Sequence, residues 1–315
     1  MRLPLTLPLS LIAVLSALVA GPTYAQNTRS WVSNTGADNN SCTLTSPCRT
    51  LPGAIAKTMV GGEVDCLGPT ESTTFTITQS ITVDCHGSLS GVDGTNIYGI
   101  VVDYGQFAGS DTARTVNLRN ITINGLAVGT TGINLRGPDA ETAGSYVNIE
   151  NCVIDGQVGA NNSVGIFDDR GRGTLTVNHT IVRNIGANGI IVFADSGGSH
   201  RVTINDTQVT NAGGGIAVGI NSDVMVVNSL VSSNLSVGLI VNPGGQMVVR
   251  GSTIAHNTMG MQVSGSLTLD SSNVSFNSIG STGTINSFSN NAFVANGAFG
   301  PIVPIGTTSN PTGLR

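Results

Sequence analysis

Similar short phrases recur along residues 116–285 of this 315-residue chain, and this internal repeat limits the possible folds more than any other feature. Each phrase has two apolar residues spaced by one, a short stretch ending in Asn or Asp, and then Gly followed by alternating apolar residues. The opening pairs are Val116/Leu118, Val147/Ile149, Leu175/Val177, Val202/Ile204, Met225/Val227, Met247/Val249 and Leu267/Leu269. The Asn and Asp residues are Asn124, Asp155, Asn184, Asn211, Asn234, Asn257 and Asn277, spaced by 31, 29, 27, 23, 23 and 20 residues.

Alternation over three to five residues, interrupted by Gly, Asn and Ser, is typical of short strands joined by tight turns. Three strands per repeat, with no room for a helix, predict an all-β, single-stranded parallel β-helix over residues 63–285. Its coils should stack about 4.8 Å apart. Asn in the turns can adopt left-handed backbone and bond to neighbouring coils. A β-sandwich would not repeat the same turn residues, and the Leu-x-x-Leu-x-Leu phrase of leucine-rich repeats is missing.

The inward-facing column is expected three residues before each Asn or Asp. Its predicted members are Ile121, Cys152, Ile181, Gln208, Val231, Ile254 and Val274. Cys152 is therefore interpreted as a core residue rather than a redox site.

Charged residues make up only 10% of the chain, against about 25% in an ordinary soluble domain. Such a low charge argues against a coiled coil or a disordered tail. It also argues against a nucleic-acid partner, because neutralising phosphates takes clustered Lys and Arg and this chain has the single lysine Lys57.

Residues 1–25 have the layout of a secretory signal peptide. Arg2 supplies a positive charge, residues 3–20 are almost wholly apolar, and small residues stand at 23 and 25. A membrane anchor is the alternative, because the apolar run approaches the length of a membrane span. Early prolines and the polar exit favour cleavage after Ala25. The expected product is secreted, periplasmic or held in the cell envelope, with no membrane span after cleavage.

In an oxidising compartment, four cysteines near the N-terminus are expected to form disulfides rather than bind zinc. They are Cys42, Cys48, Cys66 and Cys85. Three pairings are possible, and proximity in sequence favours Cys42–Cys48 and Cys66–Cys85.

The two ends of the solenoid are expected to be closed differently. Residues 26–62 form an N-terminal lead-in with an amphipathic capping helix over 49–60, which Gly61 and Gly62 would end. Strands are expected at 63–67, 74–78 and 81–85. From residue 286 to 315 the repeat dissolves into Gly, Asn, Ser and Pro, which predicts an irregular C-terminal cap and tail.

The pattern resembles the right-handed parallel β-helix repeat proteins, relatives of the pectate and pectin lyases, over about residues 31–290. The opening of exported bacterial members is similar to three stretches here: Trp31 to Asp38, Cys42 to Thr50, and Gly62-Glu63-Val64. The resemblance implies the fold, while proteins with this fold include lyases, glycosidases, epimerases, adhesins and members without known activity.

Loops that join each third strand to the next coil are long in the early coils and short in the late ones. The early loops are Asp103–Arg114, Arg136–Tyr146, Asp168–Thr174 and Phe193–Arg201. These loops hold 12 of the 31 charged residues: Asp103, Asp111, Arg114, Arg136, Asp139, Glu141, Asp168, Asp169, Arg170, Arg172, Asp195 and Arg201. Stacking of the coils brings the loops to one edge, which makes that edge the candidate site. The alternative is that loops hold the charges of any protein.

Asp168 is the position in this region that departs most clearly from the repeat. The residue three places after the Gly that opens the third strand is apolar in other coils: Leu135, Val192, Val218, Val241 and Val263. A carboxylate in an apolar column is costly unless it is paired. Either the strand ends early and Asp168 turns outward, which we favour, or an arginine such as Arg170, Arg172 or Arg201 neutralises it.

If they face outward, Asp168, Asp169 and Asp195 form a catalytic carboxylate cluster. Arg170, Arg172, Arg201 and His200 would then contact the substrate. One fitting chemistry is Ca²⁺-assisted β-elimination, in which carboxylates hold the metal and Arg170 or Arg172 takes a proton. The other is glycoside hydrolysis by two carboxylates. The Arg-x-x-Pro-x-x-Arg phrase of lyases is missing, as are the partners of the polygalacturonase Asp-Asp element, so no catalytic role is carried over from either family.

These observations favour an exported β-helix protein that recognises an extracellular polysaccharide along a loop-lined groove, with or without cleaving it. The alternative is a non-enzymatic scaffold of the cell envelope or an adhesin-like protein. The missing catalytic sets and an aromatic content of 4% favour that alternative.

Overall fold

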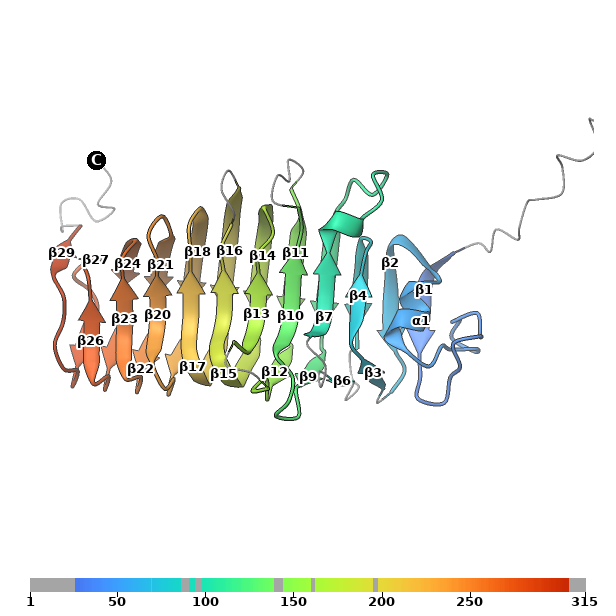
Figure 1. Ribbon diagram of the computed structural model, residues 1–315, viewed down its shortest axis with the longest axis horizontal. Helices are drawn as coiled ribbons and strands as arrows, with labels where there is room; N and C mark the ends of the chain where they lie inside the picture. Colours follow the sequence, from blue (N-terminus) through green and yellow to red (C-terminus); the bar gives the residue numbers. More distant parts are fainter. Residues whose placement is uncertain are drawn as a thin grey trace, which may run out of the picture.

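The computed structural model describes residues 26–68, 70–85, 91–93, 98–138, 144–159, 162–194 and 198–305. The chain winds into an elongated solenoid whose coils follow one another from β1 to β29 (Figure 1). Consecutive coils pair through parallel strands. The fold is thus the predicted parallel β-helix, and helices are minor.

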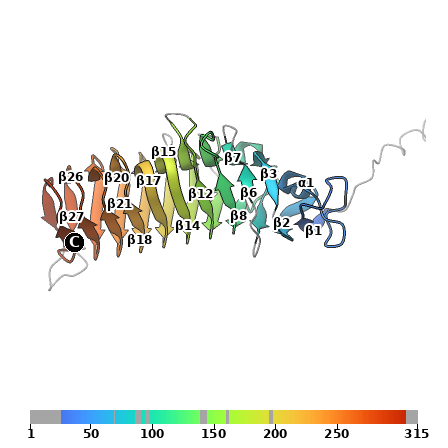
Figure 2. The same cartoon turned by 90° about the horizontal axis from the view of Figure 1, so that it is seen from below.

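The first sheet takes the opening strand of each coil and contains 12 strands in the described part of the chain. These are β1 (Asn27–Val32), β2 (Thr58–Cys66), β5 (Ile81–Asp84), β8 (Thr115–Arg119), β11 (Tyr146–Glu150), β14 (Arg172–Asn178), β16 (Ser199–Asn205), β18 (Ser222–Val227), β21 (Gln246–Arg250), β24 (Ser266–Asp270), β27 (Ile285–Ser287) and β29 (Ile302–Pro304). Turning the molecule by 90° shows β2, β8, β14, β18 and β21 following one another along it (Figure 2).

The second sheet takes the two remaining strands of each coil and contains 17 strands in the described ranges. Its short middle strands are β3 (Glu71–Thr73), β6 (Gly91–Asp93), β9 (Thr122–Asn124), β12 (Val153–Asp155), β19 (Leu230–Ser232), β22 (Thr253–Ala255), β25 (Asn273–Ser275) and β28 (Ala292–Val294). Its third strands are β4 (Phe75–Ile77), β7 (Tyr98–Asp103), β10 (Thr131–Arg136), β13 (Val164–Asp168), β20 (Val237–Val241), β23 (Met259–Val263) and β26 (Ile279–Thr282). Two long strands, β15 (Ile181–Val192) and β17 (Gln208–Val218), run through both positions.

Apolar side chains fill the inside of the solenoid in columns, one residue per coil. In the first sheet, Val116 pairs with Val147 and Val147 pairs with Leu175, and all three are buried. The predicted pair Met225/Val227 is wrong by one residue: Val224 and Val226 face inward, and Met225 is 46% exposed. Side chains of a strand alternate between its two faces. An error of one residue in the predicted register therefore places every side chain of that strand on the wrong face.

The predicted residues before each Asn and Asp do not form one column. Val231, Ile254 and Val274 are buried as predicted, but they align with Val209, whereas Ile181 and Gln208 occupy a different position. Register aligns Val153 with Ile181 and Gln208, and Gln208 is exposed. Cys152 instead shares its place with buried hydroxyl residues of the later coils, Thr180, Thr207, Ser229, Ser252 and Ser272. Backbone N–H groups donate to these oxygens coil after coil, for example Ser229 to Ser252 at 3.0 Å. The prediction that Cys152 lies in the core is confirmed.

Replacing Cys152 with Ser should change the free energy of unfolding by less than about 1 kcal/mol, although the site is fully buried. The Sγ already lies 3.3 Å from the Glu150 carbonyl and 3.6 Å from that of Leu118, as a ladder hydroxyl would. Burial raises the pKa of the Cys152 thiol to about 12, so alkylation of the native protein should be very slow. Urea unfolding and thiol titration check both points, and a loss above about 2 kcal/mol would contradict the ladder assignment.

A second ladder consists of asparagines at the corner between the middle and third strands, of which Asn234, Asn257 and Asn277 are buried and Asn296 is partly buried. Asn234, Asn257, Asn277 and Asn296 follow one another, and each Oδ1 accepts from the backbone N–H of the preceding coil at 3.0–3.1 Å. Each Nδ2 donates to a carbonyl of the preceding coil, as Asn257 does to Val231 at 3.2 Å. The predicted hydrogen bonding of Asn between coils is thereby confirmed.

Glycine opens the third strands because the neighbouring coil leaves no space for a side chain. At Gly165, a Cβ would lie 2.4 Å from the Gly189 carbonyl oxygen and 2.4 Å from Cγ1 of Val182. The same crowding recurs at Gly132 and Gly215. The Gly of each phrase is therefore a packing requirement of stacked coils.

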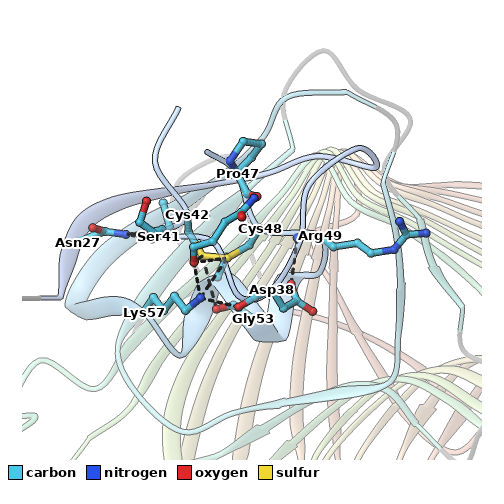
Figure 3. Close-up of a disulfide and its surroundings, with 12 residues drawn as sticks. Asn27, Asp38, Ser41, Cys42, Pro47, Cys48, Arg49, Gly53 and Lys57 are labelled. Atoms are coloured by element: carbon cyan, nitrogen blue, oxygen red, sulfur yellow. Dashed lines mark hydrogen bonds between the residues drawn. A yellow bond between two sulfur atoms is a disulfide. The ribbon is translucent and has the colours of Figure 1, made fainter. Parts of the chain in front are cut away.

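The N-terminal cap contains both predicted disulfides, Cys42–Cys48 and Cys66–Cys85. Its helix is shorter than predicted: α1 covers only Leu51–Ile55, capped by the Thr50 side chain, which accepts from Gly53 N–H at 3.1 Å. Residues 58–60 belong to β2 instead, in which Thr58 pairs with Asn27 of β1, and Gly61 lies within that strand rather than ending the helix. The Lys57 ammonium donates to backbone carbonyls beside Cys42–Cys48 (Figure 3).

The C-terminal end is more regular than predicted. β28 pairs in parallel with β25, and β29 pairs with β27, so strand stacking continues to residue 304 instead of ending at 285. The predicted signal peptide, residues 1–25, lies outside the described residues. A 3-10 helix, η2 (Tyr104–Gln106), follows β7. The described helices are all too short to cross a membrane.

Candidate functional site

Asp168 lies inside the solenoid, so the favoured expectation that β13 ends early is wrong. Its neighbours in the column are Leu135 on β10 and Val192 on β15, and its side chain is fully buried. The alternative arrangement is present instead, in which an arginine neutralises the carboxylate. That arginine is Arg170, which is also fully buried.

Asp168 and Arg170 form a bidentate ion pair. Arg170 Nε donates to Asp168 Oδ1 at 2.8 Å, and Nη2 donates to Oδ2 at 2.7 Å. Burial alone would raise the pKa of Asp168, but the charge of Arg170 and its hydrogen bonds outweigh burial and hold that pKa below its ordinary value. Two rigid, parallel hydrogen bonds offset the cost of placing the charges in the core.

The rest of the guanidinium supports the loops around it. Arg170 Nη1 donates to Ser145 Oγ at 3.0 Å, and the Arg170 guanidinium lies 5.5 Å from the centre of the Tyr104 ring. The Tyr104 hydroxyl in turn donates to the Tyr146 carbonyl at 2.9 Å. The buried ion pair thus connects three of the long loops and fixes the backbone that leads into β11.

The other predicted site residues do not gather around an outward carboxylate cluster. His200 is buried, with Nε2 3.9 Å from Asp168 Oδ1. Asp169 is partly buried, and its backbone N–H donates to Leu135 O at 3.0 Å. Asp195 lies outside the described residues. Arg170 and His200, predicted to contact substrate, therefore lie in the interior.

Arg172 and Arg201 lie at the surface, in a pocket of about 270 Å³ at the start of β11, β14 and β16. The pocket is lined by Gly144, Tyr146, Arg172, Gly173, Thr174, Ser199 and Arg201. The Tyr146 side chain is half exposed. The residues Tyr146, Thr174 and Arg201 share one register across the three strands, so their side chains project from the same face. We refer to this feature as the arginine pocket.

Charge in the arginine pocket is unbalanced. Within the described residues neither Arg172 nor Arg201 forms an ion pair, whereas six other arginines do. Of the described carboxylates, Asp223 lies beside Arg201 in register on β18, outside the pocket lining. The pocket therefore suits an anionic group.

The floor of the arginine pocket rests on the buried ion pair. A Cβ at Gly173 would lie 2.6 Å from Arg170 Nη1, so the guanidinium lies directly beneath this glycine. Ser145 Oγ, which Arg170 contacts, also donates to the Arg172 carbonyl at 2.9 Å. Gly173 and Ser145 were not predicted as site residues from the sequence. The signal for this part of the site was the equal register of Tyr146, Thr174 and Arg201 on the three strands.

No three His, Cys, Asp or Glu side chains of the described residues lie together in a way that could hold a metal ion. Asp168 lies in the core and cannot belong to an outward cluster, whereas Asp195 is not among the described residues, so a Ca²⁺ ion held by Asp169 and Asp195 stays a prediction.

The right-handed β-helix region family model matches residues 170–310. XylC in complex with xylose aligns with a TM-score of 0.54 and 11% identity, covering 85% of this chain and 70% of that one. Pectate lyase Pel9A aligns with a TM-score of 0.51 and 15% identity, covering 91% and 79%. No curated protein matches the chain by sequence. The chain therefore has the right-handed parallel β-helix fold that its resemblance implied.

Proposed function

We propose that this protein binds an acidic polysaccharide outside the cell and holds a sugar carboxylate in the arginine pocket. The observation that carries this proposal is the pair of guanidinium groups, Arg172 and Arg201, in one surface pocket beside Tyr146. Guanidinium is the side chain best suited to bind a carboxylate through two hydrogen bonds. A volume of about 270 Å³ suits one sugar unit of a chain that continues along the surface.

The two fold neighbours support a carbohydrate ligand as an analogy. One is a pectate lyase, and the other was solved with xylose. Because fold alone does not determine function, the proposal depends on the pocket and not on the likeness.

Export is part of the proposal. The two disulfides suit an oxidising compartment, and the residue pattern of 1–25 is that of a secretory signal peptide.

For turnover, Asp169 and Asp195 remain the candidate carboxylates, while Asp168 is bound by Arg170 in the core. Hydrolysis would need two carboxylates across the scissile bond, and β-elimination would need Ca²⁺ beside them. Assays on uronate polymers with and without Ca²⁺, comparing the parent protein with Asp169→Ala/Asp195→Ala, separate an enzyme from a binding protein.

Arg172→Ala and Arg201→Ala should each weaken binding of a uronate oligosaccharide about tenfold to a hundredfold, because each removes a charge-assisted hydrogen bond of about 1.5–3 kcal/mol. Calorimetric titration with oligogalacturonate measures the effect. Raising the salt concentration should weaken binding by the parent protein as well.

Arg250→Ala is the matched control, since Arg250 is an exposed arginine of the first sheet that pairs with Asp270 in a later coil. The affinity of the Arg250→Ala variant for oligogalacturonate should equal that of the parent protein. Equal affinities for the Arg172 and Arg250 variants would contradict the proposal, and no binding of any uronate polymer would favour the scaffold role instead.

A further inference from the structure

The corner between the middle and third strands uses left-handed backbone in each of seven successive coils of the described chain. The residues there and their φ values are Gly156 (76°), Asn184 (55°), Asn211 (53°), Ser233 (59°), His256 (56°), Phe276 (55°) and Ala295 (53°). Glycine and asparagine adopt this conformation at little cost, whereas a bulky side chain does not. The first three residues therefore match the backbone, and Phe276 does not.

The exception at Phe276 is not explained by burial. Its side chain is 56% exposed, and His256 in the preceding coil is also exposed. A core phenylalanine stabilises a fold by leaving water, and Phe276 gains little in that way. A costly backbone conformation that holds an exposed aromatic ring points to a role in binding.

His256 and Phe276 together form a flat, two-ring surface. Their ring centres lie 5.1 Å apart with only 4° between the ring planes, so the rings stack along the axis of the solenoid. Ser233 holds the equivalent corner one coil earlier, and its side chain is too small to extend the stack. Ala295, at the equivalent corner one coil later, is equally small, so neither neighbouring corner extends the stack, and one of its two open ends is next to Ser233.

A pocket of about 350 Å³ occupies this place. It is lined by Ser233, Asn234, Leu235, His256, Asn257, Thr258, Phe276 and Ser278. Leu235 is 76% exposed at its edge. Its lining combines ring faces, hydroxyl groups and an exposed leucine, and it includes no carboxylate, guanidinium or ammonium group.

We propose that the His256–Phe276 stack and this pocket form a second carbohydrate site, which takes an uncharged sugar ring. The C–H face of a pyranose packs on an aromatic ring, and its hydroxyls need partners such as those of Ser233, Thr258 and Ser278. A lining without carboxylate, guanidinium or ammonium groups favours a neutral sugar over the acidic sugar proposed for the arginine pocket. The two sites lie on different coils and different corners, and neither proposal depends on the other.

Titration of the mature protein with xylohexaose, cellohexaose and mannohexaose tests the proposal. At least one of these neutral oligosaccharides should bind and shift the NMR signals of the Phe276 ring, a readout that needs no variant. Phe276→Asn should then weaken binding at least tenfold. Because Asn suits left-handed backbone, the same variant should keep or raise the melting temperature.

Two controls keep the outcomes distinct. Phe276→Tyr retains a ring and should retain binding, and Arg172→Ala/Arg201→Ala should leave neutral-sugar binding unchanged even if acidic-sugar binding is lost. The proposal is overturned if none of the three oligosaccharides binds. It is also overturned if Phe276→Asn binds as tightly as the parent while its melting temperature falls, since the stack would then be purely structural.

Discussion

Asp168→Ala is expected to lower the free energy of unfolding by about 3–5 kcal/mol, because it leaves the Arg170 guanidinium charged and fully buried without its partner. Both charges lie in the core, so solvent cannot replace the missing carboxylate. Urea unfolding followed by circular dichroism measures the loss. Glu150→Ala is the control, because Glu150 forms a half-exposed ion pair with Arg119, and its loss should cost about 0–1 kcal/mol.

A double-mutant cycle sharpens this expectation. Asp168→Val/Arg170→Met should be less destabilised than the sum of its single variants, because no unpaired charge remains. Additive losses would show that the two residues act separately, contrary to the bidentate geometry. The double variant should also loosen the arginine pocket, since a thioether in place of the guanidinium has no N–H to donate to Ser145.

The Asp168 pair also gives the stability a pH dependence. The pKa of Asp168 is lower in the folded protein than in the unfolded chain, where it is about 3.9. Its stabilising contribution is therefore complete above the unfolded value and is lost as the pH falls through the folded value. Asp168→Asn should flatten the acid limb of the unfolding free energy below about pH 4, relative to the parent.

Asn257→Ala should cost about 2–4 kcal/mol, because it leaves several buried polar groups without partners. Asn257 Oδ1 accepts from the backbone N–H of Asn234 at 3.0 Å and from its Nδ2 at 2.9 Å. Its own Nδ2 donates to Asn277 and to the Val231 carbonyl. Thermal unfolding and hydrogen exchange at the Asn234 amide report the loss.

The contrast is Asn211→Gly. Asn211 has φ 53° at the exposed corner, a backbone conformation that glycine also adopts readily. The substitution should therefore lower the free energy of unfolding by less than about 1 kcal/mol. If the two substitutions had equal effects, the buried ladder would contribute nothing beyond the turn.

Much of the fold was predictable because alternation and turn residues are local signals. It was not predictable, however, that the repeated Asn and Asp residues occupy different positions in their coils. Asp155 ends a strand, Asn211 is at the left-handed corner, and Asn257 lies one residue further on, in the buried ladder. Asparagine suits the corner and the ladder for different reasons, so the same letter in a phrase does not identify one place in the coil.

The candidate site, like the fold, was predictable from the sequence only in part. Comparing the repeats placed Asp168 in the correct apolar column. Whether its side chain points inward or outward depended on whether an oppositely charged residue could reach it inside the solenoid. Arg170 lies in the loop before β14 and Arg172 is the first residue of β14; Arg170 points into the core, while Arg172 lines the surface pocket. Only the three-dimensional path of that loop decides between them.

The two ladders have a consequence for how a chain of this kind changes length. Because each inward polar group is satisfied by the equivalent group one coil away, the natural unit of insertion or deletion is a complete coil. The interval from Asn234 to Asn257 is such a unit, and removing residues 235–257 would let Asn234 face Asn277 with the same donors and acceptors. Loss of a single residue inside that unit would instead displace both ladders at once. Rod length can thus vary in whole steps while the interior chemistry stays constant.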